Sequence, residues 1–176
     1  MGATKTLLII VLALAIILYI QAYLKPKQEY TIIQTYLDKI TQDTLQDKYP
    51  IVIYDLIHEP RTLLDTLFAY QFAFSNNKTL SEPTNEVIKA RSKYNIIYSD
   101  NDSSTINIIS PKHTAFIKPK TPLQDQSDQI QYITIKLKKH QVMILPLSWY
   151  FATKDPVKII TLDDLLSALL NSFNII

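Results

Sequence analysis

An uncharged apolar run from Leu7 to Leu24 limits what this chain can become more than any other feature. Its only polar side chains, Tyr19, Gln21 and Tyr23, lie near its C-terminal end. At about 1.5 Å per residue, a helix of this length nearly matches the hydrocarbon core of a bilayer, about 30 Å thick. We therefore expect a transmembrane helix over residues 7–24, and a single-pass membrane protein whose first partner is the lipid bilayer.

The residues that flank the run bear on its fate and its orientation. Tyr19 and Tyr23 fall where aromatic side chains sit at the headgroup level, and Lys25 and Lys27 end the run. A cleaved signal peptide with Lys5 in its basic region is the alternative, but the run is long for one and no small-x-small cleavage site stands out at its end before Lys25. Because Lys25 and Lys27 outweigh Lys5, the positive-inside rule places the C-terminal part in the cytosol.

Gly2 is the only glycine of the chain, and it stands in the sequence MGATKT. A glycine after the initiator methionine, with Thr6 at the expected spacing, fits the pattern for N-myristoylation. The alternative is that small residues commonly follow an initiator methionine. A lipidated Gly2 would keep the N-terminus cytosolic and oppose the lysine signal, so the sequence leaves the sidedness open.

Composition limits the remainder. After the apolar run about 150 residues remain, enough for one hydrophobic core. The chain has no cysteine, which excludes a disulfide framework and cysteine-ligated metal sites. The net charge of +2 gives no general reason to expect a nucleic-acid partner.

The hydrophobic pattern divides the chain into four segments. We expect an N-terminal tail over 1–6, the transmembrane helix over 7–24, an amphipathic connector helix over 25–48, and a soluble β-rich domain over 49–176. The connector has apolar residues at helical spacing, and its polar face is not rich in lysine. That favours packing against the domain over lying on the membrane.

Short β-branched runs separated by turn formers dominate the rest. Strands are predicted at 49–57, 93–99, 104–110, 115–117, 131–139, 141–151 and 157–160, with 131–139 and 141–151 as a hairpin and a loop over 75–86. Helices are predicted from Pro60 to Gln71 and over 161–173. This is an α+β chain whose domain is a small β-sandwich or barrel with flanking helices.

The closing helix has a polar start and an apolar stripe. Thr161 can cap it, and Asp163 and Asp164 lie at the positive end of its dipole, so capping explains this acidic pair without catalysis. The stripe expected to be buried consists of Leu162, Leu165, Leu166, Leu169 and Phe173.

The segment HQVMILPLSWYF resembles the second motif of cupins and of the related JmjC-like double-stranded β-helix proteins. Pro146 and Trp149 match that motif, His140 and Ser148 stand at its two glycine positions, and Phe151 replaces its metal-binding histidine. The segment YPIVIYDLIHEPRTLLDTLFAYQF also looks like the entrance strand and helix of JmjC-like proteins. The resemblance implies a cupin-like scaffold, degenerate in that its metal ligand has been lost.

Residue chemistry agrees with that expectation. A cupin or JmjC-like oxygenase needs two histidines and a carboxylate on one iron, whereas His58, His113 and His140 are scattered. No serine stands in a Gly-x-Ser-x-Gly elbow, and one glycine builds neither a P-loop nor a dinucleotide site. We therefore expect no catalytic residue, metal, cofactor or small-molecule substrate, and hence no enzyme. The alternative is a membrane-tethered, metal-dependent oxygenase with unusual ligands.

Two basic clusters form a possible interaction surface for phosphates or an acidic partner: Lys112, Lys118 and Lys120, and Lys136, Lys138 and Lys139. The alternative is a solvated face that protects an edge strand. Trp149, Tyr150 and Phe151 could line a stacking pocket, but aromatic residues within a strand usually pack in the core.

Richness in Ile, Lys, Asn and Tyr, together with the anchor, is similar to virion membrane proteins of large eukaryotic DNA viruses. The resemblance implies a non-enzymatic structural or interaction protein, capsid-associated, in a virion inner membrane or a host endomembrane used for assembly. Its partners would be other virion or membrane proteins. A cellular adaptor that recruits a soluble partner to a membrane is a further alternative.

Overall fold

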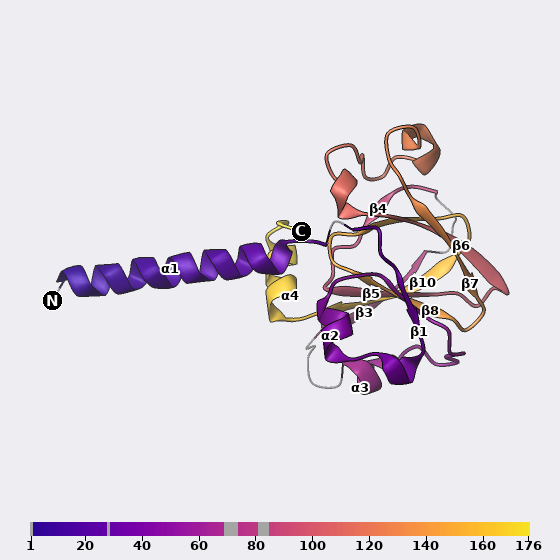
Figure 1. The fold of residues 1–176 in the computed structure, drawn as a ribbon, viewed down its shortest axis with the longest axis horizontal. Coiled ribbons are helices and arrows are strands. Elements are labelled where there is room, and N and C mark those ends of the chain that lie inside the picture. Colours follow the sequence, from indigo (N-terminus) through magenta and orange to yellow (C-terminus); the bar gives the residue numbers. More distant parts are fainter. Residues whose placement is uncertain (1, 28, 69–73, 81–84) are drawn as a thin grey trace.

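A long helix projects from a β-rich body (Figure 1). The computed structural model describes residues 2–27, 29–68, 74–80 and 85–176, with the backbone alone for 2–4 and 74–80. Helix α1 (Gly2–Leu24) ends where the sequence predicts, just before Pro26, which cannot donate a backbone hydrogen bond. It starts earlier than predicted, because nothing between Gly2 and Leu7 breaks a helix. Most of the expected tail over 1–6 is therefore helical.

The body contains all the remaining elements. In chain order they are β1 (Ile33–Thr35), η1 (Leu37–Lys39), α2 (Gln42–Gln46), β2 (Ile51–Ile53), α3 (Thr62–Leu67), β3 (Phe74–Leu80), β4 (Ile88–Lys89), β5 (Tyr94–Tyr98), β6 (Ser103–Ile109), η2 (Pro111–His113), η3 (Leu123–Gln126), β7 (Ile133–Lys138), β8 (Val142–Pro146), β9 (Tyr150–Thr153), β10 (Val157–Asp163) and α4 (Leu165–Ser172).

The strands form two sheets. The larger has the order β1-β2-β8-β5-β10-β3, and the smaller has the order β4-β9-β6-β7. Among the described residues, β1 and β2 pair in parallel and the other strand pairs are antiparallel. Mixed helices and antiparallel sheets confirm the predicted α+β class.

The main core lies between the two sheets. Residues from both sheets pack in one buried cluster: Val52, Ile97, Met143, Leu145, Val157 and Ile159 from the larger, and Ile106, Ile108, Ile135, Leu137 and Phe151 from the smaller. Trp149, 0% exposed, belongs to the same cluster. The body is therefore a β-sandwich, in which the alternating pattern of each strand places apolar side chains on the inner face.

Both outer faces of the sandwich are also covered. Leu45 of α2 and Leu63 and Leu67 of α3 pack on the far face of the larger sheet, and these helices lie below it in Figure 1. The segment 111–130 covers the outer face of the smaller sheet, with Ile117 and Leu123 against it. A sheet buried on both faces explains why β5 and β8 are almost continuously apolar.

The predicted connector helix over 25–48 is wrong. Residues 33–35 form β1, which pairs in parallel with β2 from Ile33↔Ile51 onward. Helix α2 is only five residues long, and Thr41 caps it by accepting a hydrogen bond from the backbone of Thr44. The β-branched residues beside Ile33 are more stable when they pair with a buried strand at the sheet edge than they would be in a short exposed helix.

The predicted hairpin of 131–139 with 141–151 is also wrong. Strand β7 pairs with β6, whereas β8 pairs with β2 and β5 in the other sheet. His140, with φ 66°, lies where the chain crosses between sheets, and Ser148, with φ 72°, separates β8 from β9. Both positions that the cupin motif assigns to glycine therefore adopt the left-handed conformation that glycine favours.

Three smaller expectations also differ. The predicted loop over 75–86 contains most of β3, which pairs with β10 along its whole length, and residues 81–84 lie outside the described residues. The segment 115–117 is not a strand, although Ile117 is buried. Helix α3 ends at Leu67, and the remainder of the helix predicted to Gln71 lies largely outside the described residues.

Candidate functional site

A network of polar contacts lies where α1 meets the body. The apolar part of this junction joins the last turns of α1 to the C-terminal segment: Ile20, Tyr23, Leu24 and Leu166 pack against buried Leu147, Leu170 and Ile176. The C-terminal end of α1 therefore meets the C-terminal segment of the chain here, while the N-terminus lies at the far tip of α1 (Figure 1).

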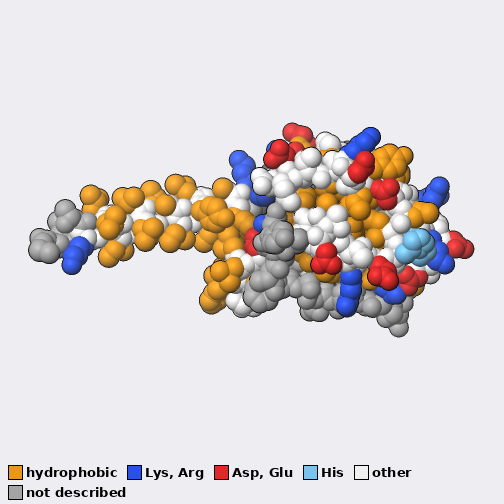
Figure 2. Space-filling model, turned by 90° about the horizontal axis from the view of Figure 1, so that it is seen from below, with side chains coloured by type: hydrophobic (Ala, Val, Ile, Leu, Met, Phe, Trp, Pro, Cys, Tyr) orange, Lys and Arg blue, Asp and Glu red, His pale blue; other side chains and the backbone are white. Residues whose placement is uncertain are grey.

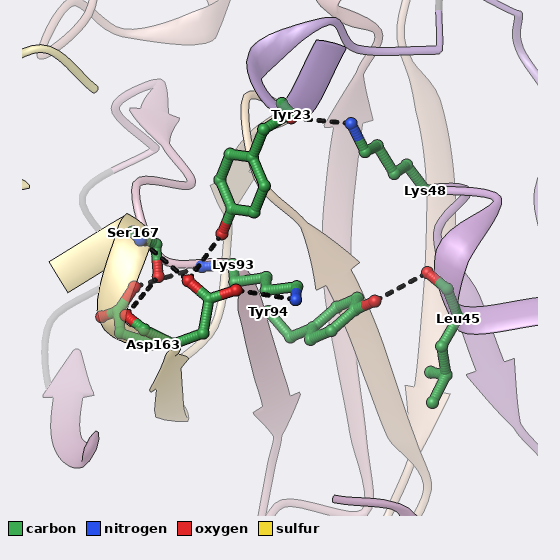
Figure 3. Close-up of polar contacts among 8 residues, drawn as sticks. Tyr23, Leu45, Lys48, Lys93, Tyr94, Asp163 and Ser167 are labelled. Carbon is green, nitrogen blue, oxygen red and sulfur yellow. Dashed lines mark hydrogen bonds and ion pairs between the residues drawn. The ribbon is translucent and has the colours of Figure 1, made fainter. Parts of the chain in front are cut away.

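Asp164 is the centre of the polar part, and its partners Tyr23, Lys93 and Ser167 are labelled in Figure 3. Its carboxylate accepts a hydrogen bond from the Tyr23 hydroxyl at 2.9 Å and pairs with the Lys93 ammonium at 2.8 Å. It also accepts a hydrogen bond from the backbone N–H of Ser167 at 2.8 Å and so caps α4. One side chain thus connects α1, the start of β5 and α4.

The surroundings of Asp164 favour its charged form. Burial raises the pKa of this carboxyl, but the hydrogen bonds from Lys93, Ser167 and Tyr23, with the Lys93 charge, outweigh burial and hold the pKa below its ordinary value. The neighbouring Asp163 accepts hydrogen bonds from the Ser92 hydroxyl and the Lys93 backbone N–H. Both carboxylates therefore stabilise the fold locally.

Lys48 holds the end of α1 from the other side. Its ammonium donates to the backbone carbonyls of Ala22, Tyr23 and Lys25 at 3.2, 2.7 and 3.1 Å. The last carbonyls of a helix have no partner within the helix and carry its negative end, so a lysine satisfies both needs. Burial, with the charges of Lys93 and Lys27, lowers the pKa of Lys48.

A cavity of about 330 Å³ lies between α1 and the body, lined by Tyr19, Tyr23, Gln46, Lys48, Lys93, Tyr94, Pro146 and Leu147. The Tyr94 hydroxyl donates to the Leu45 carbonyl at 2.8 Å. Burial, with the Asp164 charge, raises the pKa of Tyr94 to about 12. The tyrosines and lysines that line the cavity make it amphipathic, and Tyr19 and Tyr23 form its wall on α1.

The sequence predicted capping at the start of the closing helix, and Asp164 confirms it. Thr161 does not cap the helix, because β10 continues through it to Asp163. The predicted buried stripe is wrong in its main part. Leu165, Leu169 and Phe173 are 75%, 53% and 67% exposed, while Leu170 is buried.

Some of the predicted anchor residues lie on the exposed part of α1, and others lie where α1 contacts the body. Leu7 and Tyr19 are exposed, whereas Tyr23 and Leu24 pack on the body. The Lys27 ammonium lies 5.6 Å from the centre of the Tyr49 ring, and Lys25 accepts from Lys48 through its carbonyl. Residues Lys5–Leu24 form a helix long and apolar enough to cross a membrane, a test that a signal sequence also passes.

The structure brings two of the three histidines together. The rings of His58 and His140 lie 4.4 Å apart, in a cavity of about 290 Å³ at the end of the sandwich opposite α1. His113 lies elsewhere, 5.7 Å from the Tyr30 ring. Within the described residues, no group of three or more His, Cys, Asp or Glu side chains could hold a metal.

Aromatic residues after β8 belong to the core. Trp149, Tyr150 and Phe151 are at most 3% exposed, and the Trp149 indole donates to the Lys48 carbonyl at 3.2 Å. Phe151, at the position of the cupin metal ligand, points into the apolar core between the sheets. No stacking pocket is formed by these three side chains.

The six lysines of the predicted interaction surface are all exposed. Lys136 and Lys138 alternate with buried residues on β7, an edge strand, and Lys139 follows them. Lys112, Lys118 and Lys120 lie in the segment that leaves β6 at its other end. The structure therefore does not merge the two clusters along the β6–β7 ladder, and their role stays a prediction.

Sequence reasoning missed Lys48 and Lys93 and the pairing of His58 with His140. Each depends on contacts between residues far apart in the chain, and no local pattern marks them. The exposed face of α4 did have a signal, because no residue from Leu165 to Ile176 is charged and leucines occur on more than one side of the helix.

No protein-family model matches the chain, and no curated protein matches it. Chains of solved structures do match, among them a 1.63 Å crystal structure of dTDP-4-dehydrorhamnose 3,5-epimerase (rfbC) from Bacillus anthracis str. Ames with TDP and PPi bound. That protein is 14% identical, the match covers 72% of this chain and 76% of the other, and the TM-score is 0.35.

This match bears on two expectations. The epimerase is cupin-like, a double-stranded β-helix protein, which agrees in part with the predicted resemblance. It is also an enzyme, so the expectation that the chain is not an enzyme is contradicted. At this identity and TM-score, neither its activity nor its ligands are carried over to this chain. The matches lend no support to the resemblance to virion proteins.

Proposed function

We propose that this chain is a single-pass membrane protein that holds its β-sandwich in a defined orientation at the bilayer surface, as an interaction module. One observation carries the proposal: α1 is apolar and exposed along most of its length, and its C-terminal end is fastened to the body. An isolated apolar helix of this length in water would expose a surface that only a bilayer or other protein covers.

The contacts that fasten α1 to the body support a retained anchor over a cleaved signal peptide. Tyr23 bonds Asp164, Lys48 bonds three carbonyls at the end of α1, and Leu24 packs with Leu147 and Leu170. Cleavage before Lys25 would remove Tyr23 and Leu24 and leave Leu170 and Asp164 without these partners. These contacts therefore support retention of the helix.

The test is membrane extraction of the full chain. Intact-mass measurement should find α1 present, and the protein should stay in the pellet after washing membranes at alkaline pH. A variant with Leu12→Arg and Ile16→Arg should be released, because each charge near the helix centre costs about 2.5–3.5 kcal/mol on insertion. A matched variant with Leu56→Arg, at an exposed leucine of the body, should stay bound. Release of the unmodified chain, or loss of residues 1–24, would overturn the proposal.

The membrane we propose is that of a viral particle or of its assembly compartment, with other membrane or virion proteins as partners. The support is the composition and the small anchored domain alone. Quantitative mass spectrometry of purified particles decides this part. Recovery with cellular membranes and absence from particles would favour a cellular adaptor instead.

A further inference from the structure

We propose that α4 is a second membrane contact: its exposed apolar face lies in the headgroup and upper acyl region of the same leaflet that α1 leaves. The inference rests on the proposed function, because it takes α1 to be in a bilayer. It adds a second segment, from the other end of the chain, that fixes the orientation of the body.

Helix α4 exposes an apolar face, which a helix on a water-exposed surface does not. Two of its polar residues face the body, since Ser167 is 0% exposed and the Asn171 amide donates to the Arg91 carbonyl, whereas Ser172 is exposed. Leu165 and Leu169 of α4, and Phe173 at its C-cap, are exposed, whereas Leu166 and Leu170 pack inward. The three exposed apolar residues are spaced four residues apart and so lie on one face of the helix.

Ile175, three residues beyond the helix, is also exposed, at 55%. No residue between Leu165 and Ile176 carries a charge. An uncharged patch of this kind is costly in water and suits an apolar surrounding.

The position of α4 indicates that the bilayer covers this apolar face. Leu166 and Leu170 pack with Ile20, Tyr23 and Leu24 of α1, so α4 sits at the base of the anchor. It runs across the direction of α1 instead of along it (Figure 1). A helix at the base of a spanning helix, and across it, lies in the plane of the interface.

The apolar surface is continuous between the two helices. In Figure 2 the hydrophobic side chains that cover α1 continue at its base into a second hydrophobic group beside the body. Tyr19 and Tyr23, at the level expected for the headgroups, belong to the same region of α1. The bilayer that receives α1 is therefore the surface nearest to Leu169 and Phe173.

The absence of cysteine makes the test direct, because single-cysteine variants of the full chain can be labelled at one position. An NBD fluorophore is placed at Leu169→Cys, at Leu14→Cys in the middle of α1, and at Leu56→Cys. Leu56 is the matched control, since it is 63% exposed and belongs to the segment at the end of the sandwich opposite α1. Unchanged emission from the buried Trp149 shows that each variant is folded.

The variants are reconstituted in phosphatidylcholine and phosphatidylglycerol vesicles with a lipid quencher at carbon 5 or carbon 12 of the acyl chain. The probe at 169 should emit to the blue of the probe at 56 and be quenched several-fold more strongly. Carbon 5 should quench position 169 better than carbon 12, and the reverse should hold at position 14.

Equal, weak quenching at 169 and 56 with strong quenching at 14 would overturn this inference and leave the anchor intact. Weak quenching at all three positions would overturn the proposed function as well. If position 169 were shielded without lipid quenching, and more so at higher protein-to-lipid ratio, a second copy of the chain would cover the face and the inference would be wrong.

Discussion

Asp164 should be the side chain whose loss most weakens the attachment of α1 to the body. As an N-cap it contributes about 1 kcal/mol. A hydrogen bond to a charged group contributes about 1.5–3 kcal/mol, and a partly exposed ion pair less than about 1 kcal/mol. Because the Tyr23 and Lys93 contacts share one carboxylate, they do not add in full. We expect Asp164→Ala to lower the free energy of unfolding by about 3 kcal/mol.

Asp164→Asn separates the contribution of helix capping from that of the charged contacts with Tyr23 and Lys93. Asparagine caps a helix about as well as aspartate, so this variant should lose about 2 kcal/mol and retain the cap. The matched control is Asp100→Ala. Its carboxylate pairs with Lys158 on the open surface, so the loss there should be below about 1 kcal/mol.

The assay is urea unfolding of the full chain in lipid nanodiscs, followed by the emission of Trp149. This is the only tryptophan, it is fully buried, and it bonds Lys48 beside the junction. A double-mutant cycle of Asp164→Asn with Tyr23→Phe should give a coupling energy above about 0.5 kcal/mol. An Asp164→Ala effect no larger than that of Asp100→Ala would refute the reasoning.

The same carboxylate predicts a pH dependence. Its pKa in the folded chain lies below the ordinary value of about 3.9. The contribution of the charged Asp164 carboxylate to the free energy of unfolding is therefore present above about pH 4, and it is lost as the pH falls through the folded pKa. The difference in unfolding free energy between the native chain and Asp164→Asn should narrow below about pH 4, and a constant difference down to about pH 2 would contradict this assignment.

Three further predictions concern other parts of the chain. Ser148→Gly should stabilise the body by about 0.5 kcal/mol, because φ is 72° there, whereas Ser127→Gly, at φ −59°, should destabilise it by a similar amount in the same urea assay. Lys48→Met should cost about 1 kcal/mol, since burial and neighbouring positive charges offset part of its bonds to α1, and no loss would contradict its capping role. An alkyne-tagged myristate should label the chain through Gly2 and fail to label Gly2→Ala, and equal labelling of both would refute that site.

Local patterns were enough for the parts of this protein that depend on near neighbours in the chain. The apolar run specified α1 and its end at Leu24, because helix length and side-chain transfer energy are properties of the segment itself. The alternating or continuous apolar pattern located β5, β6, β7 and β10 to within a few residues. The special positions at His140 and Ser148 were also visible, through their spacing in the motif.

The pairing partner of each strand was decided only by the tertiary structure. The segment around Ile33 had a helical spacing of apolar residues, but pairing with β2 made it a strand. Strands β7 and β8 are separated by only three residues, yet each gains its hydrogen bonds in a different sheet.

The junction shows the same limit for the site. Lys48, Lys93 and Asp164 converge on the end of α1 from three separate segments, and no sequence window contains them together. Helix α4 has leucines on more than one face, and periodicity alone could not tell which face the body would bury. The buried face is the one that carries Leu166 and Leu170, because these residues pack at the base of α1. Leu169 and Phe173 therefore stay exposed. The sequence by itself therefore determined an apolar anchor and a β-rich body, whereas long-range packing alone decided how one is fastened to the other.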